Sequence, residues 1–362
     1  MSILTRIAAE TGIPLAFLSL VARTTDHRYK IYTIPKVSGG QREIQHPARE
    51  MKFLQRWVVS NIFAHVTVHP AATAYRRGTS VRGNAALHIH GRFFLKLDFA
   101  DFFPSIRVVD VKILLTQLSP ILPVALTEED MNVVAKIVTR NGQLPIGAPS
   151  SPIISNAVMY EFDDAMSHLA QQFSCIYSRY ADDIVFSTNV PYALGNVLKE
   201  VWKYVSVHTS PALMLNEAKV VFNSKKRRVR ITGLVIDCDN NISVGREQKR
   251  KIKSLIHRFK TASLDAQHTS YLKGYLGFVK TVEPKFVDAL VNKYGQEVID
   301  TIYNAPTIEL KTQKDGERRR RGQNHCGRPL ASLEIVLFPR SQLRASSASV
   351  APSARRRRAS AF

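Results

Sequence analysis

YSRYADDIVFS, residues 177–187, is the most informative stretch of this sequence. Two β-rich runs, CIYSRY and IVFS, flank Ala181-Asp182-Asp183 and predict a β-hairpin whose turn carries adjacent acids. Adjacent carboxylates repel each other, so one of the two pKa values rises unless a cation neutralises the pair. A divalent metal ion is the simplest such cation, because Mg²⁺ prefers hard oxygen ligands.

A third carboxylate comes from FFLKLDFADFFPSI, residues 93–106. The apolar run 93–99 predicts a strand that ends around Asp98. Metal-assisted phosphoryl transfer needs carboxylates that generally arrive from different strands, so Asp98 is a candidate ligand beside Asp182-Asp183. A second adjacent pair, Asp163-Asp164, lies in a helical pattern and is expected to face solvent. The hairpin context therefore distinguishes Asp182-Asp183, not the dipeptide itself.

The charge of the whole chain indicates a polyanionic partner. Its 362 residues include 51 Lys and Arg against 29 Asp and Glu, a formal net charge of +22. A hydrophobic fraction of 45% and a charged fraction of 22% are typical of a globular protein and exclude wholesale disorder. A basic globular chain of this kind favours nucleic acid as its partner.

Cellular location follows from what the composition lacks. No apolar run approaches the roughly 18 residues that span a bilayer, and the first residues do not resemble a signal peptide. Cys175, Cys238 and Cys326 are widely and unequally spaced, which supports neither a disulfide framework nor a zinc site. We expect a soluble cytoplasmic protein that does not contact the membrane.

Hydrophobic periodicity predicts the remaining elements of an α+β chain. The region up to residue 23 is helical but interrupted at 12–14, and a hairpin surrounds residues 38–40. Further helices are predicted over 51–68, 109–118, 128–138, 153–169, 194–208 and 246–260, and strands over 219–222 and 230–236. Beyond about residue 309 periodicity is lost, and 13 Lys and Arg against three acids make residues 311–362 a flexible basic tail.

Five segments occur in the order of the palm and primer-grip motifs of reverse transcriptases. They are FFLKLDFADFFPSI, LPIGAPSSPIISN, YSRYADDIVFS, LNEAKVVF and ITGLVID. The chain resembles this family from about Tyr29 to Lys285, with Tyr180-Ala181-Asp182-Asp183 as its YxDD signature. Within the family it resembles the bacterial retron reverse transcriptases, through NAALH at 84–88, ITG at 231–233 and GYLGFVKTVEP at 274–284.

The resemblance implies a right-hand polymerase with fingers, an RRM-like palm and a helical thumb. We expect fingers and N-terminal helices in 1–90, a palm in 91–240 with a fingers insertion at about 107–145, and a thumb in 241–310. Asp98, Asp182 and Asp183 would be the catalytic residues and would hold two Mg²⁺ ions, with the backbone of Phe99 as a further ligand.

The resemblance also implies a nucleotide site. Its residues would be Lys36 and Arg42 on the triphosphate, Phe103 as a steric gate against ribose, Lys219 as proton donor or phosphate contact, and Gly147, Ala148 and Pro149 beneath the nascent base pair. The alternative for Lys36 and Arg42 is that they lie on a solvated face of the hairpin. The alternative for Phe103 is a position in the hydrophobic core. Ile146 stands where the family usually has Gln, which removes an amide near the nucleotide.

RNA recognition is the third implied role. Asn84 and His88 are spaced to share one helical face and match an element with which retron enzymes help recognise their own RNA; a structural histidine is the alternative. Thr232 and Gly233 match a second retron element. The basic helix with Arg250, Lys251 and Lys253 resembles the thumb that grips duplex and RNA stem, although a charged run alone would indicate a solvated face.

The implied activity is RNA-directed DNA synthesis. The enzyme would use dNTPs to copy its cognate non-coding RNA, the msr-msd transcript, into branched multicopy single-stranded DNA (msDNA), primed from an RNA 2′-hydroxyl. The resemblance leaves no room for an RNase H domain, so a host RNase H would act on the product, and an effector protein would join it in anti-phage defence. The alternatives are another bacterial, group II intron-like reverse transcriptase and a non-catalytic RNA-binding scaffold.

Overall fold

The structure is a computed structural model, which describes residues 1–35 and 39–306. Lys36 and the basic tail 311–362 lie outside the described residues, so the predictions made for them stay predictions. Residues 1–32 and 43–306 belong to one compact unit, and the described residues between 33 and 42 belong to a second.

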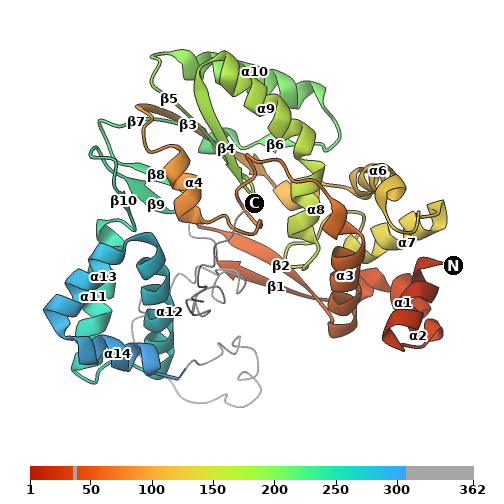
Figure 1. Ribbon diagram of the computed structural model, residues 1–362, viewed down its shortest axis with the longest axis horizontal. Helices are drawn as coiled ribbons and strands as arrows, with labels where there is room; N and C mark the ends of the chain where they lie inside the picture. The colour runs from red at the N-terminus through yellow and green to blue at the C-terminus, as the bar shows by residue number, and fades with distance from the viewer. Residues whose placement is uncertain (36–38, 307–362) are drawn as a thin grey trace, which may run out of the picture. The chain divides into compact units, whose positions relative to one another are not determined.

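An antiparallel five-stranded sheet forms the centre of the main unit (Figure 1). Its strand order is β4-β5-β3-β6, and β7 also pairs with β3. The bounds are Phe93–Ala100 (β3), Cys175–Tyr180 (β4), Asp183–Thr188 (β5), Met214–Leu215 (β6) and Val221–Ser224 (β7). The hairpin β4–β5 and strand β3 confirm the predictions for the YxDD stretch and for residues 93–99.

Successive side chains of a strand point to opposite faces of the sheet. The apolar side chains on the two faces belong to two separate hydrophobic cores, here called the main core and the second core. Leu95 on β3 is paired with Phe186 on β5, and both belong to the main core. Helices α9 (Tyr160–Gln172) and α10 (Ala193–Val207) pack on this part of the sheet, as Figure 1 shows. Phe94 and Val185, which precede Leu95 and Phe186 by one position, point to the opposite face and belong to the second core.

The N-terminal half confirms most of the helical predictions, and its helices pack in the main core except α4, which belongs to the second core. Its helices are Ile3–Thr11 (α1), Leu15–Arg23 (α2), Arg49–Asn61 (α3), Val81–Leu87 (α4), Phe102–Ser105 (α5), Val108–Leu118 (α6) and Glu128–Val138 (α7). The helix predicted over 51–68 ends early, at Asn61, and a 3-10 turn, Phe63–His65, follows it. Strands β1 (Tyr29–Pro35) and β2 (Gln41–Pro47) form the predicted hairpin.

The single helix predicted over 153–169 is two helices. Ser151–Val158 (α8) and Tyr160–Gln172 (α9) are separated at Met159, whose ψ of 4° departs from helical values. The break lets α8 pack against α6 while α9 packs against β4. Hydrophobic periodicity cannot detect this change of direction, because both halves present a continuous apolar stripe.

A second sheet follows the central one, with strand order β10-β9-β8. The strand predicted over 230–236 is a hairpin of β8 (Val229–Ile231) and β9 (Leu234–Ile236), and β10 is Ile242–Ser243. Thr232 and Gly233 form its turn with φ of 44° and 84°, the pair of positive values that a type I′ hairpin turn requires. The other predicted strand begins later than expected, because Lys219 lies in a 3-10 turn, Glu217–Lys219.

Four helices complete the described chain and pack on one another (Figure 1). They are Arg246–Lys260 (α11), Ala266–Val282 (α12), Pro284–Tyr294 (α13) and Gln296–Asn304 (α14). Helix α11 has the predicted bounds and buries Ile252, Leu255 and Ile256 in the second core. Within residues 1–35 and 39–306, no helix is long and apolar enough to cross a membrane.

Candidate active site

The hairpin and strand β3 bring the three candidate acids to one end of the central sheet. Asp183 is the first residue of β5 and lies directly opposite Asp98 on β3. Opposed residues of an antiparallel pair have Cα atoms about 4.5–5.5 Å apart. Asp182 precedes them in the turn, and its carbonyl accepts a hydrogen bond of 3.3 Å from the Phe99 amide. The structure thus gathers residues 84 positions apart that the sequence predicted to act together.

The turn that carries these acids holds a strained backbone. Only Ala181 and Asp182 separate β4 from β5, and buried Ala181 has a φ of 57°. Left-handed backbone costs an alanine roughly 1–2 kcal/mol, because Cβ crowds the following carbonyl. Such strain persists only where surrounding contacts compensate for it.

The electrostatics of this end of the sheet favour a cation. Burial is the largest influence that raises the pKa of Asp183, to about 6, and the charges of Asp182 and Asp98 add to it. Lys96 and Lys219 act in the opposite direction. The Nζ atom of Lys219 lies 2.6 Å from Oδ1 of Asp98, so the protein already places one cation on the cluster.

Oxygen donors with uncompensated negative charge are the ligands that Mg²⁺ prefers, and on this ground the three carboxylates fit a divalent metal. In the part of the chain that the structure describes, no group of three or more His, Cys, Asp or Glu side chains is arranged so that it could hold a metal ion. One oxygen of Asp98 pairs with Lys219 instead.

The predicted nucleotide residues lie in several environments. Phe103 is half-buried in α5, with its ring centroid 5.3 Å from that of Phe102 and 6.4 Å from that of Tyr75. It packs against the main core and keeps part of its surface exposed, so both interpretations of this residue remain open. Arg42 is exposed on β2, in the second compact unit.

The loop at 145–149 is seated on strand β2. The Gln45 amide donates a 2.8 Å hydrogen bond to the carbonyl of Ile146. Gly147 is exposed with a φ of 110°, and a Cβ there would lie 3.1 Å from Cγ2 of Ile44. Only glycine combines this backbone with this close approach. Ala148 is buried and Pro149 is half-buried.

Asn84 and His88 are inside the protein, and their implied part in RNA recognition stays a prediction. His88 is fully buried between the hydroxyls of Ser178 and Ser187, with both ring nitrogens at 2.7 Å from an oxygen. Burial lowers the pKa of His88 to about 3, so the ring is neutral. The Oδ1 atom of Asn84 accepts hydrogen bonds from Ser178 and Thr73. The physical reason is that α4 packs against β4 and β9 and turns this face inward.

The second retron element lies against the first. The hydroxyl of Thr232, in the β8–β9 turn, is 3.5 Å from the carbonyl of Val81 at the start of α4. The two segments are 151 positions apart in the chain, so only the tertiary structure shows that they are neighbours. Gly233 completes the turn with positive φ.

The basic helix α11 keeps its predicted charged face available. Arg250 and Lys253 are exposed and Lys251 is half-buried. The Nζ atom of Lys251 lies 5.2 Å from the centroid of the Tyr271 ring, and that of Lys253 lies 5.8 Å from the Phe286 ring. These cation–π contacts hold the two ammonium groups over aromatic rings at the surface of the helix.

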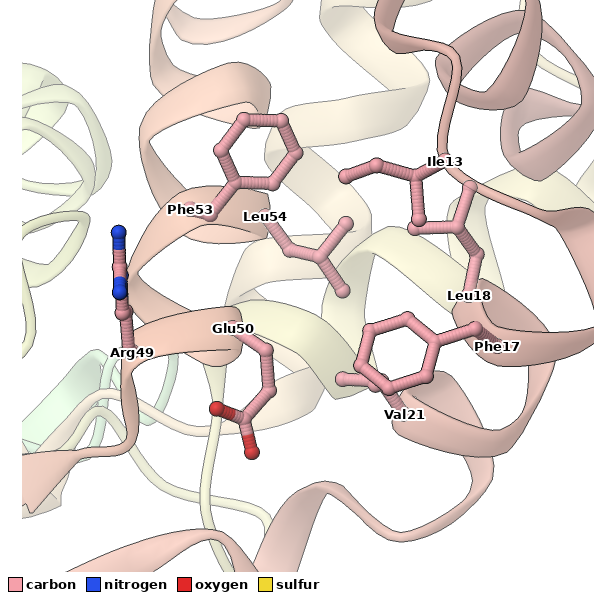
Figure 2. Close-up of a pocket in the computed structure, with 8 residues that line it drawn as sticks. All are labelled: Ile13, Phe17, Leu18, Val21, Arg49, Glu50, Phe53 and Leu54. Carbon is pink, nitrogen blue, oxygen red and sulfur yellow. The ribbon is translucent and has the colours of Figure 1, made fainter.

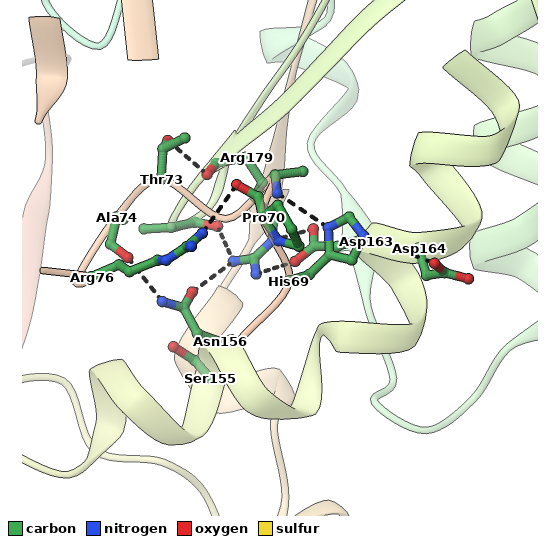
Figure 3. A network of polar contacts seen from close by, with 12 residues as sticks. His69, Pro70, Thr73, Ala74, Arg76, Ser155, Asn156, Asp163, Asp164 and Arg179 are labelled. Atoms are coloured by element: carbon green, nitrogen blue, oxygen red, sulfur yellow. Dashed lines mark hydrogen bonds and ion pairs between the residues drawn. The ribbon is translucent and has the colours of Figure 1, made fainter. Parts of the chain in front are cut away.

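Sequence reasoning missed a buried ion pair directly behind the turn. Asp163, expected to face solvent, is fully buried and pairs with Arg179 of β4, whereas Asp164 is half-buried (Figure 3). The available signal was Arg179 itself, because a cation in an otherwise buried strand requires an anionic partner.

One cavity lies outside this region. It measures about 240 Å³ and lies between α2 and α3, where Phe17 and Phe53 form part of an apolar lining (Figure 2). None of the three candidate acids lines it.

Comparison with known proteins identifies the relatives of this chain. Residues 34–236, more than half of the chain, match the family model described as reverse transcriptase (RNA-dependent DNA polymerase). The retron Ec83 reverse transcriptase of Escherichia coli is 34% identical over 83% of this chain and 98% of its own length. The retron Ec86 enzyme of the same organism is 31% identical over 83% and 91%.

Among solved structures, apo telomerase from Candida tropicalis is similar with a TM-score of 0.45 and 14% identity, over 76% of this chain and 57% of that one.

Proposed function

Because the chain belongs to the reverse transcriptases, and among them to the retron reverse transcriptases, we propose that it copies a cognate retron non-coding RNA into branched msDNA. The observation that carries this proposal is the pairing of Asp98 with Asp183 beside Asp182, at the end of a sheet in a chain with retron relatives. Synthesis would start from a 2′-hydroxyl of the RNA and consume dNTPs.

Asp98, Asp182 and Asp183 would hold two Mg²⁺ ions, with the backbone of Phe99 as a further ligand. When bound, such ions lower the pKa of the priming hydroxyl and stabilise the departing pyrophosphate. The raised pKa of Asp183 supports this assignment, because a carboxyl among like charges gains most from a bound cation. Lys219, now on Asp98, would be released to a phosphate oxygen or donate a proton to the leaving group.

The nucleotide would lie between this cluster and the loop of Gly147, Ala148 and Pro149. The loop has a rigid seat on β2, which supports a role beneath the nascent base pair. Phe103 would exclude ribonucleotides through its ring, and Lys36 and Arg42 would meet the triphosphate.

The RNA would contact α11 through Arg250, Lys251 and Lys253, of which Arg250 and Lys253 are exposed. Asn84, His88, Thr232 and Gly233 would act indirectly, by holding α4 and the β8–β9 turn together beneath a recognition surface. We further assign to the proposed function a host RNase H that trims the product and an effector protein in anti-phage defence.

The discriminating experiment combines Asp182→Asn with Asp183→Asn. Purified protein and its cognate RNA should yield no DNA from the double variant, while RNA affinity changes less than about twofold, since the amides keep the shape of the turn. The matched control is Asp164→Asn, which removes a half-buried acid of the other adjacent pair. Treatment with a 2′–5′ debranching enzyme should release the product from RNA. Undiminished DNA synthesis by the double variant would refute the proposed catalytic role and favour a scaffold.

A further inference from the structure

Arg179 and Asp163 form an ion pair that solvent does not reach. Both side chains have 0% exposure. Nε of Arg179 donates to Oδ1 of Asp163 at 2.7 Å and Nη2 donates to Oδ2 at 2.6 Å. Figure 3 shows the guanidinium and carboxylate facing each other in this bidentate arrangement, which fixes the orientation of the guanidinium plane.

The remaining guanidinium nitrogen reaches the turn of the candidate active site. Nη1 of Arg179 donates to the Ala181 carbonyl at 3.1 Å and to Oδ1 of Asn156 at 3.3 Å. Asn156 is itself held, since its Nδ2 donates to the Ala74 carbonyl at 2.8 Å. The Ala181 carbonyl belongs to the residue with left-handed backbone, immediately before Asp182.

The rest of the network anchors the pair from other elements. The Tyr177 hydroxyl donates to Oδ1 of Asp163 at 2.7 Å. The backbone carbonyl of Arg179 accepts a hydrogen bond from the amide of Thr73 at 2.8 Å, and the Thr73 hydroxyl oxygen lies 3.0 Å from it. The guanidinium therefore has few ways to move without breaking several hydrogen bonds.

A buried ion pair is a poor means of stabilising a fold. The desolvation of two charges often exceeds their attraction, and apolar replacements are frequently neutral. The position of this pair suggests a role other than stabilising the fold. The Nη1 atom of Arg179, which does not bind Asp163, donates to the carbonyl of Ala181 in the turn. A charged donor also compensates for part of the strain at Ala181.

We propose that Arg179, oriented by Asp163, is a positioning residue that holds the Ala181 carbonyl and so fixes the direction in which Asp182 and Asp183 leave the turn. The proposal rests on the proposed catalytic function of that turn. It assigns roles to two residues that touch neither nucleotide nor RNA.

Arg179→Lys tests it most directly. A lysine keeps the charge opposite Asp163, but its single ammonium cannot form the bidentate pair and also reach Ala181. We expect kcat for nucleotide addition to fall about 10–100-fold, the scale of a small misplacement of catalytic groups. The KM for dNTP and the RNA affinity should change less than about threefold.

Tyr177→Phe is the matched control. It removes one hydrogen bond to Asp163 but leaves the contact of Arg179 with Ala181 intact. Tyr177→Phe should lower the melting temperature without lowering kcat. If Arg179 had a purely structural role, kcat would instead fall together with the melting temperature in both Tyr177→Phe and Arg179→Lys. If Arg179→Lys does not fold, Asp163→Asn replaces it, because it keeps an acceptor for Arg179 and should lower kcat in the same direction.

Wild-type kcat in a folded Arg179→Lys or Asp163→Asn variant would overturn the proposal, as would an equal loss in Tyr177→Phe. Failure of the proposed function has a different signature, namely wild-type protein that binds RNA and makes no DNA.

A separate observation concerns the basic run KKRRVR at residues 225–230, which forms the loop between β7 and β8 and the first two residues of β8. Lys226, Arg227, Arg228 and Arg230 are exposed. Within residues 1–35 and 39–306, no ion pair involves any of these four side chains.

Lys225 anchors this loop. Its amide donates to the Arg92 carbonyl at 2.8 Å, and its ammonium contacts Ile89 and Asn240. Exposed His90 and Arg92 therefore lie on the neighbouring segment and extend the basic surface. Asp237 and Asp239 in the next turn are the nearest acids along the chain, too few to balance these cations.

The loop lies at the far end of the sheet from the candidate acids. Ser224 pairs with Phe93, five residues along β3 from Asp98, which corresponds to about 17 Å at roughly 3.3 Å per residue. That distance excludes contact with a reacting nucleotide but suits the backbone of a bound nucleic acid. We infer that Lys226, Arg227, Arg228 and Arg230 bind phosphates of the cognate RNA outside the active site. This inference also rests on the proposed function.

The test is a triple variant, Lys226→Ala with Arg227→Ala and Arg228→Ala, whose binding to the cognate RNA is measured by anisotropy at several salt concentrations. The slope of log affinity against log salt should become shallower by about 2, at roughly 0.7–0.9 per lost phosphate contact. The charge-matched control removes exposed Lys112, Lys199 and Lys203 from α6 and α10. DNA synthesis on a short pre-annealed primer-template should persist.

An unchanged salt slope, or an equal change in the control, would overturn the inference. Weaker binding of the DNA product with unchanged RNA binding would also overturn it. None of these outcomes depends on catalysis, so they are distinguishable from failure of the proposed function.

Discussion

His88 shows how a single buried side chain links stability to pH. Its neutral ring offers one donor and one acceptor to the hydroxyls of Ser178 and Ser187. Its folded-state pKa is about 3, whereas an unfolded histidine titrates near pH 6.5. Below pH 6.5 the unfolded state therefore binds more protons, and stability falls as the pH falls toward 3.

We predict that His88 alone costs the protein about 2 kcal/mol of unfolding free energy between pH 6.5 and pH 4.5, because the slope rises to roughly 1.4 kcal/mol per pH unit only below the unfolded pKa. Urea unfolding of wild type and His88→Gln over this range measures the effect. The variant should be less stable at pH 7, because it loses fitted hydrogen bonds, yet vary less with pH. Parallel curves for the two proteins would contradict a neutral buried His88.

Phe103 provides a test of sugar selection. Its ring is half-buried against Phe102 and retains an exposed part. If that part lies beside the incoming sugar, Phe103→Ala should increase incorporation of rNTP relative to dNTP by about 10–100-fold, the effect of reshaping one small contact. Single-turnover incorporation with both substrates measures the ratio. Phe53→Ala on α3 is the matched control, and an unchanged ratio would leave Phe103 as a core residue.

The hairpin β4–β5 is the element on which the proposed chemistry depends. Its register places Tyr180 and Asp98 on either side of Asp183. The acids keep this geometry only while the two-residue turn keeps its positive φ at Ala181.

Ala181→Gly should therefore stabilise the protein by about 0.5–1 kcal/mol. Glycine removes roughly 1–2 kcal/mol of left-handed strain and gives back about 0.5–1 kcal/mol of unfolded-state entropy. The same substitution at exposed Ala86 in α4 should cost about 1 kcal/mol, because that residue is helical. Chemical unfolding measures the change in unfolding free energy for each variant, which should be positive for Ala181→Gly and negative for Ala86→Gly. Equal destabilisation by both variants would show that Ala181 is not strained.

Helices α8 and α9 illustrate why an element can be predicted while its course cannot. Their apolar residues follow one continuous helical period, yet the backbone departs at Met159. The break allows α8 to pack against α6 and α9 to pack against β4. Local pattern contains no information on which partner each half meets.

The charge of the whole molecule divides between the described chain and the tail 311–362, which contributes 13 Lys and Arg against three acids. We predict that removal of the tail weakens RNA binding at 50 mM salt by about tenfold and has little effect at 200 mM, because this attraction is screened by salt. Filter binding at both salt concentrations and single-turnover kcat measure the two consequences. Loss of polymerisation would place the end of the catalytic unit beyond residue 310.

Sequence alone determined the hairpin at 177–187, strand β3, helix α11 and the assembly of Asp98 with Asp182 and Asp183 as a candidate site. These predictions follow from local periodicity, from turn residues and from the order of motifs. Each of these signals can be recognised in the sequence without knowledge of tertiary contacts. The family assignment follows from the same motifs and agrees with the 34% identity to a retron relative.

Tertiary structure alone decided the burial of Asn84 and His88 and the pairing of Asp163 with Arg179. A helical pattern shows which residues share a face, but not whether sheet or solvent covers that face. A buried charge depends on a partner elsewhere in the chain, here one 16 positions away on a different element. Pairing across elements is a property of packing, so these contacts appear only when the chain is folded.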